Sequence, residues 1–401
     1  MKIFLLDIAE TRLQLLPLTY TRSIGELRVG ILKIHEKWSA KLGAEVNLIT
    51  EPYLGKTETI GDGTLNLIIN ASLCPDDQLI KALENLQENQ KLTQNGKFLA
   101  SKAASMPTFN QAVDDQLISV EHSGKVDLIE RPWDIFIKNG DQIRLDFDLL
   151  TKGQKSIGVE DPYTRIYNEK NIFLEKGAEV KAAILNAENG PIYIGKNTKI
   201  HEGSIIRGPF ALCEYGQVNM GAKIRGDSTF GPHTKVGGEV ANSVIMGYSN
   251  KGHDGYLGSS VIGEWCNLGA DTNTSNMKNN YTQVKMWDYT KDSFINTGLQ
   301  FCGLIMGDHS KCGINTMFNT GTVVGVSANI FGSGYPGNVI PSFSWGGSAG
   351  FTTYRLDKAK ETATIAMRRK TKGWTDPDDG IFEEIFKRSE KYRVWENKNE
   401  L

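Results

Sequence analysis

The 401-residue sequence predicts three successive parts: an α/β domain, a solenoid of short β-strands and a helical tail. The solenoid is predicted because an apolar residue returns every six positions through much of the second half of the chain. A second observation is the composition, since the chain has 42 glycines but only 12 prolines. Such an excess of glycine over the usual roughly 7% favours a repeat built on tight turns. The third is that residues 1–160 lack the period and alternate between strand and helix patterns.

The N-terminal part, residues 1–160, is predicted to pack helices against a sheet. The apolar runs at residues 2–6 and 66–70 are typical of buried strands. Residues 80–92 carry leucines on one face and are therefore predicted to form a helix.

The solenoid is predicted to span residues 161–352. Its longest regular run has eight apolar residues at a spacing of six: Ile194, Ile200, Ile206, Leu212, Val218, Ile224, Phe230 and Val236. The spacing resumes at Ile262 and Leu268, and again from Met306 to Ile330. A period of six fits neither a helix nor a flat strand, but it fits a strand of two or three residues followed by a turn. The pattern resembles the hexapeptide repeat of the left-handed parallel β-helix, in which three hexads form one triangular coil.

Two stretches interrupt the repeat, residues 241–261 and 274–305. A departure from a solenoid costs order, so we expect these stretches to carry function. The first contains His253, with glycine before it and Asp254 and Tyr256 after it. A neutral imidazole is the natural base for deprotonating an attacking amine or hydroxyl near pH 7. On the residues alone, His253 is either such a base or an ordinary surface histidine.

Residues 249–276 closely resemble the acetyltransferase half of the bifunctional enzymes that make UDP-N-acetylglucosamine. The block shared by that family has the form K-x-x-H-x-x-Y-x-G-D-x-x-I-G-x-x-x-N-x-G-A-G-T. The resemblance implies acetyl transfer from acetyl-CoA to the amine of a glucosamine-1-phosphate-like sugar, a step in cell-envelope precursor synthesis. It implies that His253 is the general base. The substrate-binding residues that it implies are Arg225, Lys251, Tyr256, Asn267 and Asn276.

One departure from that family affects the phosphate end of the substrate. The family's E-x-K-x-S segment reads Glu239-Val240-Ala241-Asn242-Ser243, so Ala241 replaces a phosphate-binding lysine. Losing one charged contact of about 1.5–3 kcal/mol weakens phosphate binding without affecting the base. The identity of the acceptor sugar is therefore left open.

Residues 7–19 read D-I-A-E-T-R-L-Q-L-L-P-L-T and resemble the end of the sugar-nucleotide pyrophosphorylase signature G-x-G-T-R-x-x-P-L-T. The resemblance implies that Arg12 and Lys37 bind nucleotide. However, Ile8-Ala9-Glu10 stands where glycine amides would cradle a triphosphate, and Asn70 where an aspartate would hold a metal. We therefore expect nucleotidyl transfer to be absent or feeble. Magnesium would be needed only if this domain is active, and no other metal site is predicted.

The remaining composition argues against several classes of partner. Lys plus Arg is 45 and Asp plus Glu is 47, so the formal net charge of −2 creates no overall attraction to nucleic acid or an anionic membrane. No stretch approaches the roughly 18 apolar residues of a membrane helix, and Asp7 comes too early for a secretory signal. The five scattered cysteines are expected to be reduced. We expect a cytoplasmic protein that contacts neither nucleic acid nor membrane.

The tail, residues 353–401, is predicted to form two helices, the first ending in Arg368-Arg369-Lys370. That basic cluster is either a solvated face or a contact for a coenzyme A phosphate. The resemblance further implies a homotrimer with active sites between neighbouring coils.

Two alternatives to acetyl transfer remain open. One is a uridylyl- or thymidylyltransferase that works through the N-terminal domain. The other is a non-catalytic scaffold or regulatory homologue.

Overall fold

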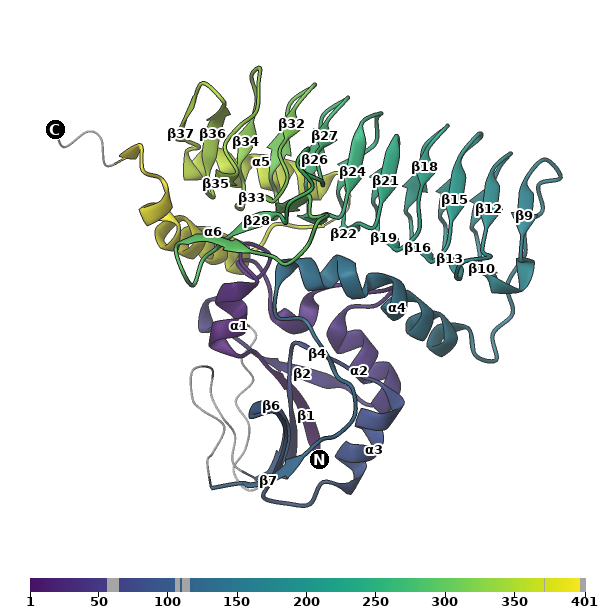
Figure 1. The fold of residues 1–401 in the computed structure, drawn as a ribbon, viewed down its shortest axis with the longest axis vertical. Helices are drawn as coiled ribbons and strands as arrows, with labels where there is room; N and C mark the ends of the chain where they lie inside the picture. Colours follow the sequence, from purple (N-terminus) through teal and green to yellow (C-terminus); the bar gives the residue numbers. More distant parts are fainter. Residues whose placement is uncertain (56–64, 105–108, 110–115, 371, 397–401) are drawn as a thin grey trace.

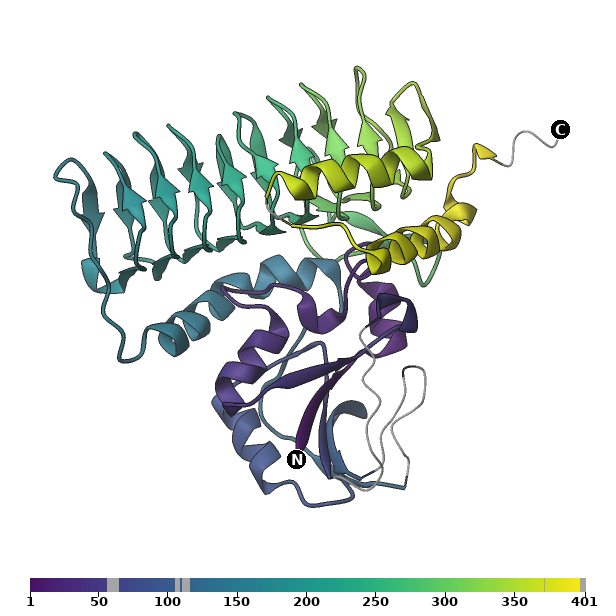
Figure 2. The ribbon, with the colours of Figure 1, turned by 180° about the vertical axis from the view of Figure 1, so that it is seen from behind.

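A computed structural model describes residues 1–55, 65–104, 109, 116–370 and 372–396. It confirms the predicted fold class: an α/β domain lies beside a long parallel β-helix, and helices complete the chain (Figure 1). Of the C-terminal helices, α5 (Leu356–Arg368) lies along the β-helix, and α6 (Asp376–Arg388) reaches the N-terminal domain (Figure 2). Within the described residues, no helix combines the length and apolar character needed to cross a membrane.

The N-terminal domain is built on a six-stranded mixed sheet. Its strands, in spatial order, are β2 (Val46–Ile49), β1 (Lys2–Leu6), β3 (Asn66–Asn70), β6 (Lys97–Ala103), β5 (Gln90–Gln94) and β7 (Ile118–Glu121). A small separate pair joins β4 (Leu73–Cys74) to β8 (Asp127–Leu128). The apolar runs predicted as strands form β1 and β3, which pair in parallel at the centre of the sheet. Both are buried, which explains why they lack polar alternation.

The helices of this domain are α1 (Ala9–Gln14), α2 (Ile34–Leu42), α3 (Asp77–Asn85) and α4 (Pro132–Thr151). Short 3₁₀ turns occur at Ile24–Glu26, Pro52–Leu54, Glu169–Asn171 and Glu390–Tyr392. The helix predicted over residues 80–92 was wrong in its bounds. The side chain of Asp76 caps α3 by accepting from the Leu79 amide. The helix ends at Asn85 because Asn89, with a φ of 61°, turns the chain into β5.

Three parallel sheets form the faces of the β-helix. Sheet 1 consists of β10 (Ile172–Leu174), β13 (Ile192–Ile194), β16 (Phe210–Leu212), β19 (Ser228–Phe230), β22 (Val244–Gly247), β25 (Val261–Glu264), β30 (Leu304–Met306), β33 (Thr322–Val324) and β35 (Val339–Ile340). Sheet 2 consists of β11 (Glu179–Val180), β14 (Lys199–Ile200), β17 (Gln217–Val218), β20 (Lys235–Val236), β23 (Asn250–Lys251), β26 (Asn267–Leu268), β31 (Lys311–Cys312), β34 (Asn329–Ile330), β36 (Ser344–Gly347) and the antiparallel β37 (Gly350–Thr353). Sheet 3 consists of β9 (Arg165–Tyr167), β12 (Ile184–Asn186), β15 (Ile205–Arg207), β18 (Lys223–Ile224), β21 (Glu239–Ala241) and β24 (Tyr256–Gly258). A further parallel pair joins β27 (Asn273–Thr274) to β32 (Met317–Phe318).

The interior of the β-helix consists of the apolar residues that define the six-residue period. Leu212 pairs with Phe230, 18 residues later, and both are fully buried. Phe230 then pairs with Ile245, only 15 residues later. The first predicted interruption, residues 241–261, is therefore not an excursion but a shorter coil, which contains β22, β23 and β24. The period broke because this coil is short, not because the chain leaves the solenoid.

The second predicted interruption does leave the solenoid. It forms an antiparallel hairpin of β28 (Lys285–Asp288) and β29 (Ser293–Asn296). Asp288 at its end pairs with Arg131 of the N-terminal domain at 2.5 Å. Tyr289 is buried and packs edge-on against Tyr20 of that domain at 6.2 Å between ring centroids. The hairpin therefore joins the β-helix to the N-terminal domain.

Helix α4 provides the other large contact between the two parts. It lies between the N-terminal sheet and sheet 1 in both ribbon views (Figures 1 and 2). The side-chain amide of Asn139 donates to the Asp227 carbonyl at 2.9 Å and to the Thr229 hydroxyl at 3.1 Å. At Gly140 an added Cβ would lie 1.9 Å from an Asp227 oxygen, so glycine permits this close approach.

We expect Phe230→Ala to lower the free energy of unfolding by about 3–5 kcal/mol, because it opens a cavity inside a close-packed coil. Phe230 is fully buried and packs edge-on against Phe210. Urea unfolding measures the loss. Ile314→Ala is the control, since Ile314 is 71% exposed and its truncation should change the free energy by less than about 0.5 kcal/mol. Equal effects of the two substitutions would contradict this packing.

Candidate functional site

His253 lies in a turn at the corner where the chain passes from sheet 2 to sheet 3. The turn, residues 252–255, links β23 to β24 and has glycine at both ends. Gly255 has a φ of 112°, and an added Cβ would lie 2.2 Å from the Thr272 carbonyl, so only glycine fits there. The His253 side chain is exposed, and its ring makes no hydrogen bond or ion pair with any described residue. The imidazole is therefore available to a substrate at this corner.

Three of the predicted substrate-binding residues lie together on sheet 3, beside this turn. Strand register places Glu239 directly between Lys223 and Tyr256. The Arg225 guanidinium pairs with Glu239 at 3.4 Å. The Asn276 amide donates to the Tyr256 hydroxyl at 3.2 Å.

Burial raises the pKa of Tyr256, and the positive charge of Arg225 opposes that shift. The Tyr256 phenol is therefore neutral and can donate a hydrogen bond. Arg225, Tyr256 and Asn276 together offer an exposed cation, a hydroxyl and an amide.

The other two predicted substrate-binding residues lie elsewhere. Asn267 is exposed on sheet 2, where its side-chain oxygen accepts from Asn250 at 3.4 Å. Lys251 lies inside the β-helix, and only 2% of its surface is exposed. Burial lowers the pKa of its amine to about 8. Neither residue joins the group on sheet 3.

Glu239, Asn273 and Ser259 belong to this site, although the sequence did not assign them to it. The Asn273 oxygen accepts from the Tyr256 amide at 2.8 Å, and the Asn276 amide lies 3.3 Å from the Ser259 hydroxyl. Glu239 is the direct partner of Arg225. The row from Lys223 to Tyr256 through Glu239 could be read from the sequence only if the length of the shortened coil were known.

Arg12, predicted to bind nucleotide, is buried inside the N-terminal domain. It pairs with the buried Asp7 carboxylate at 2.7 Å and also donates to the Arg22 carbonyl and the Thr50 hydroxyl. Burial raises the pKa of Asp7, and Arg12 opposes that shift. The guanidinium is therefore already satisfied by groups of its own domain.

Lys37, the second predicted nucleotide contact, is also buried. Its ammonium pairs with Asp146 of α4 at 2.5 Å, so it connects α2 to α4.

The residues that would have to hold magnesium in this domain do not fit it. Asp7 spends its oxygens on Arg12, Thr50, Ser23 and the Ile24 amide. The Asn70 amide oxygen accepts from Ser72. In the described part of the chain, no three His, Cys, Asp or Glu side chains are grouped as metal ligands would be.

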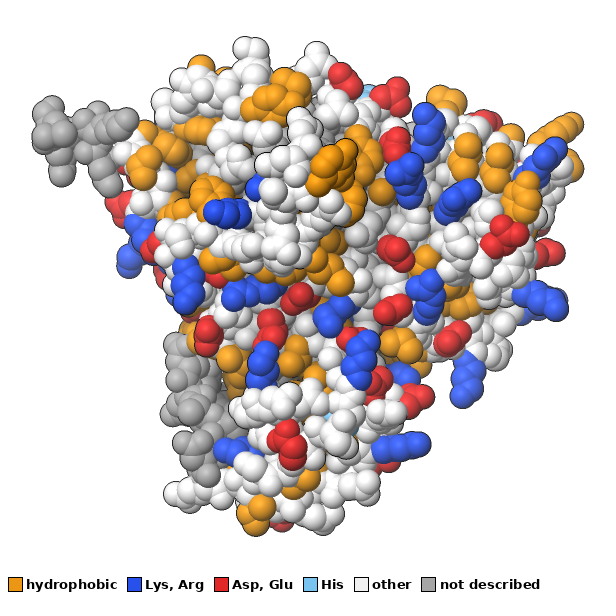
Figure 3. Space-filling view, in the orientation of Figure 1, with side chains coloured by type: hydrophobic (Ala, Val, Ile, Leu, Met, Phe, Trp, Pro, Cys, Tyr) orange, Lys and Arg blue, Asp and Glu red, His pale blue; other side chains and the backbone are white. Residues whose placement is uncertain are grey.

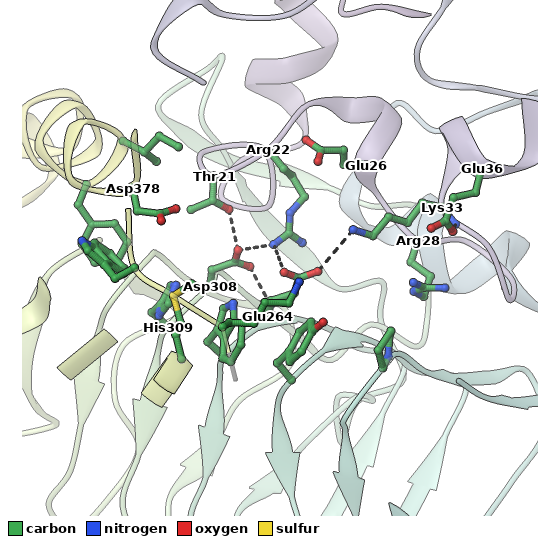
Figure 4. Close-up of a pocket in the computed structure, with 18 of the residues that line it drawn as sticks. Thr21, Arg22, Glu26, Arg28, Lys33, Glu36, Glu264, Asp308, His309 and Asp378 are labelled. Atoms are coloured by element: carbon green, nitrogen blue, oxygen red, sulfur yellow. Dashed lines mark hydrogen bonds and ion pairs between the residues drawn. The ribbon is translucent and has the colours of Figure 1, made fainter. Parts of the chain in front are cut away.

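A cavity of about 480 Å³ lies where the N-terminal domain, the β-helix and the C-terminal helices meet (Figure 4). Arg22 pairs with Asp308, and its guanidinium is 3.6 Å from Glu264. Lys33 lies 3.8 Å from another oxygen of Glu264. The Thr21 hydroxyl donates to Asp308 at 2.7 Å. These charges satisfy one another across the domain boundary, so the cluster ties the two domains together.

A ladder of aromatic rings forms one wall of the cavity. Its members, one per coil, are Tyr215, His233, Tyr248, Trp265 and His309. Consecutive rings are nearly parallel, with centroids 4.3–6.2 Å apart. Each residue has a positive φ between 54° and 62°, because each occupies the same tight corner between sheets 1 and 2. This corner differs from the one that carries His253.

The outer surface shows no dominant charge. In Figure 3, basic and acidic side chains are interspersed over the visible face. All five cysteines are free and buried, as the sequence predicted.

Comparison with known proteins identifies both halves of the chain. Residues 3–155 match the family model described as sugar nucleotidyl transferase. A bifunctional sugar-1-phosphate nucleotidylyltransferase/acetyltransferase of Sulfurisphaera tokodaii is 31% identical over 231 residues, which cover 57% of this chain and 49% of that protein. The bifunctional protein GlmU of Methanocaldococcus jannaschii is 38% identical over 87 residues, 22% of this chain and 21% of that one.

A putative uncharacterized acetyltransferase of Escherichia coli, YaiX, is 26% identical over 158 residues, which cover 39% of this chain and 66% of that protein. The matched part of the chain thus spans about half the length of the first of these relatives. The matches confirm the resemblance on which the sequence analysis rests. The chain joins a domain of the sugar nucleotidyl transferase family to a β-helix and is similar to the GlmU-like bifunctional transferases.

We expect His309 to make the protein less stable in weak acid. Burial holds the pKa of this imidazole well below its ordinary value, whereas the unfolded chain protonates it near pH 6.5. Stability is therefore complete above about pH 6.5 and falls as the pH decreases below it. Between pH 7.5 and 5.5 the native protein should lose about 1.4 kcal/mol more than a His309→Phe variant does.

Denaturant unfolding at the two pH values measures this difference. Phenylalanine is a suitable replacement because Phe343 adopts the same positive φ, 58° against 61°. Identical pH dependence in the two proteins would contradict a buried neutral His309.

Proposed function

We propose that this protein is an acetyl-CoA-dependent N-acetyltransferase acting on an amino-sugar phosphate. The observation that carries the proposal is the position of His253, which stands free on a glycine-bounded turn beside Arg225, Tyr256 and Asn276. A base, a cation and hydrogen-bonding groups on one edge are what transfer to a phosphorylated amine requires. The similarity to acetyltransferases of known or assigned type supports the same reading.

In the proposed reaction the neutral His253 imidazole takes a proton from the sugar ammonium or from the amine as it attacks. The amine nitrogen forms a bond to the thioester carbonyl carbon of acetyl-CoA. The tetrahedral intermediate then expels the coenzyme A sulfur, and the imidazolium returns a proton to that thiolate. The products are an amide and free coenzyme A, and His253 returns to its neutral state.

The phosphate end of the acceptor is assigned to Arg225. Its side chain is 68% exposed and paired with Glu239 at 3.4 Å, so an anion has access to it. Ala241 and Gly258 continue the row of Arg225 across sheet 3, since Ala241 pairs with Gly258. Neither supplies a second cation, which agrees with a weaker phosphate contact than in the related enzymes.

Coenzyme A is assigned to the side of the β-helix that carries the end of α5. There the positive charges of Lys235 and Arg369 and the partial burial of the side chain lower the pKa of Lys370. Such a cluster suits a phosphate. We also propose a homotrimer, because sheet 3 presents Tyr167 and Ile205 to the exterior at about two-fifths exposure. Sedimentation velocity of the full chain tests it, and a stable monomer would rule it out.

The alternative supported by a specific observation is nucleotidyl transfer, because residues 3–155 match the sugar nucleotidyl transferase family. Release of thiol from acetyl-CoA with a panel of amino sugars and their phosphates separates the two functions. Thiol release that depends on an amino sugar supports the proposal. Pyrophosphate release without thiol release would replace it with the alternative.

We expect His253→Ala to lower acetyl transfer by about 10²–10⁴, the usual contribution of a general base, while acetyl-CoA binding is kept. Thiol release measures the rate, and calorimetry measures binding. His201→Ala is the matched control, because His201 is another surface histidine of the same β-helix. A rate unchanged by His253→Ala would remove that residue from the mechanism.

We expect pyrophosphate release from UTP, dTTP or GTP with N-acetylglucosamine-1-phosphate and magnesium to stay below about 1 s⁻¹. The physical reason is that Arg12 and Lys37 are each neutralised by a buried carboxylate, so neither offers a free charge to a triphosphate. Thiol release by the same preparation shows that the protein is intact. Turnover at or above that rate would overturn the expectation.

A further inference from the structure

Lys251 occupies a position that other coils of the β-helix fill with apolar residues. Register places it next to Val236 on one side, and on the other side β23 pairs with β26, whose inward residue is Leu268. The column along sheet 2 reads Val180, Ile200, Val218, Val236, Lys251, Leu268, Cys312 and Ile330. Lys251 is the one charged member of this column and is 98% buried, since only 2% of it is exposed.

The buried ammonium makes hydrogen bonds to the turn that carries His253. It donates to the His253 carbonyl at 2.7 Å and to the Asp254 carbonyl at 3.3 Å. The Asp254 carbonyl also accepts from the Asp271 amide at 3.1 Å. Among the described residues, the His253 carbonyl receives a hydrogen bond only from Lys251. The backbone of the proposed base is therefore fixed from inside the coil.

The corresponding turns of later coils are fixed in another way. Thr272, the last residue of its turn, donates its hydroxyl to the Gly269 carbonyl at 2.7 Å. Thr316 does the same to the Gly313 carbonyl at 2.9 Å. In the His253 turn the corresponding position is Gly255, where an added Cβ would lie 2.2 Å from a neighbouring carbonyl. A threonine does not fit there, so the bond to the turn has to come from elsewhere.

A lysine in an apolar column costs free energy, because burial penalises its charge. The groups that face the ammonium are Asp254 on its own turn, Asp271 on the next coil and Cys312 beyond it. Their negative charges offset only part of the penalty of burial. Packing alone would favour an apolar residue like its neighbours in the column. The hydrogen bonds to the turn are what distinguishes lysine from those residues.

We infer that Lys251 is a positioning residue, whose buried ammonium holds the turn of residues 252–255 so that His253 faces the substrate at the corner. The inference rests on the proposed role of His253, but the conformation of the turn is testable without it. Lys251 acts through the backbone carbonyls of His253 and Asp254 and touches no substrate.

The test compares Lys251→Met with Lys199→Met in the full chain. Methionine matches the length of lysine and suits an apolar column, whereas Lys199 faces outward on the same sheet and pairs with Glu179. For Lys251→Met we expect kcat to fall about 10–100-fold, with KM changed less than about twofold and the midpoint of thermal unfolding equal or higher. Lys199→Met should change neither constant. A fall in thermal stability together with a proportional loss of folded protein, or an unchanged kcat, would overturn the inference.

Two measurements keep the test independent of acetyl transfer. In Lys251→Met, the amides of residues 252–255 should exchange with deuterium at least about tenfold faster, whereas His253→Ala should leave them slow. In the native protein, acetylation by an N-hydroxysuccinimide ester, read by mass spectrometry, should modify Lys199 at least about tenfold faster than Lys251. Equal labelling, or exchange unchanged by Lys251→Met, would overturn the inference. Positive results without any acetyl transfer would instead reject only the proposed function.

Discussion

The β-helix depends on burying a few inward side chains per coil, which no coil can do alone. Strands of two to four residues pair with a coil on either side, so residues such as Phe230 and Ile245 become fully buried only in the stack. The end of the stack is closed because β37 turns back antiparallel on β36. Every other feature of the molecule attaches to this rigid support.

The corner between sheets 1 and 2 holds the two domains together. The aromatic ladder occupies its left-handed positions, and the last ring of the ladder, His309, lies beside Asp308, the partner of Arg22. The segment of the N-terminal domain that begins at Asp7 is thereby committed to internal contacts, with Arg12 bonded to Asp7 and to the Arg22 carbonyl. A segment that its family uses toward nucleotide serves here to hold the domain against the β-helix.

The candidate acetyl-transfer site lies at a different corner, between sheets 2 and 3. This separation has a consequence for mechanism, since the N-terminal domain of the same chain contacts sheet 1 through α4 and does not border the turn of His253. The reaction proposed here therefore depends on the β-helix and on whatever chain packs against sheet 3. Within the coil, glycine and a buried lysine fix the turn, and the exposed face of sheet 3 supplies the polar groups.

The sequence by itself determined the β-helix and the position of His253 beside Tyr256, because a six-residue period and a local motif need no knowledge of distant contacts. Only the tertiary structure decided which side chains point inward. The coil after Phe230 is three residues shorter than the one before it, and that change of register places Lys251 inside and Asn267 on another sheet from Tyr256. Likewise, Lys37 reads as a free cation until folding brings Asp146, over a hundred residues away, within 2.5 Å. Strand register and ion-pair partners are set by packing between distant segments, and no local pattern records them.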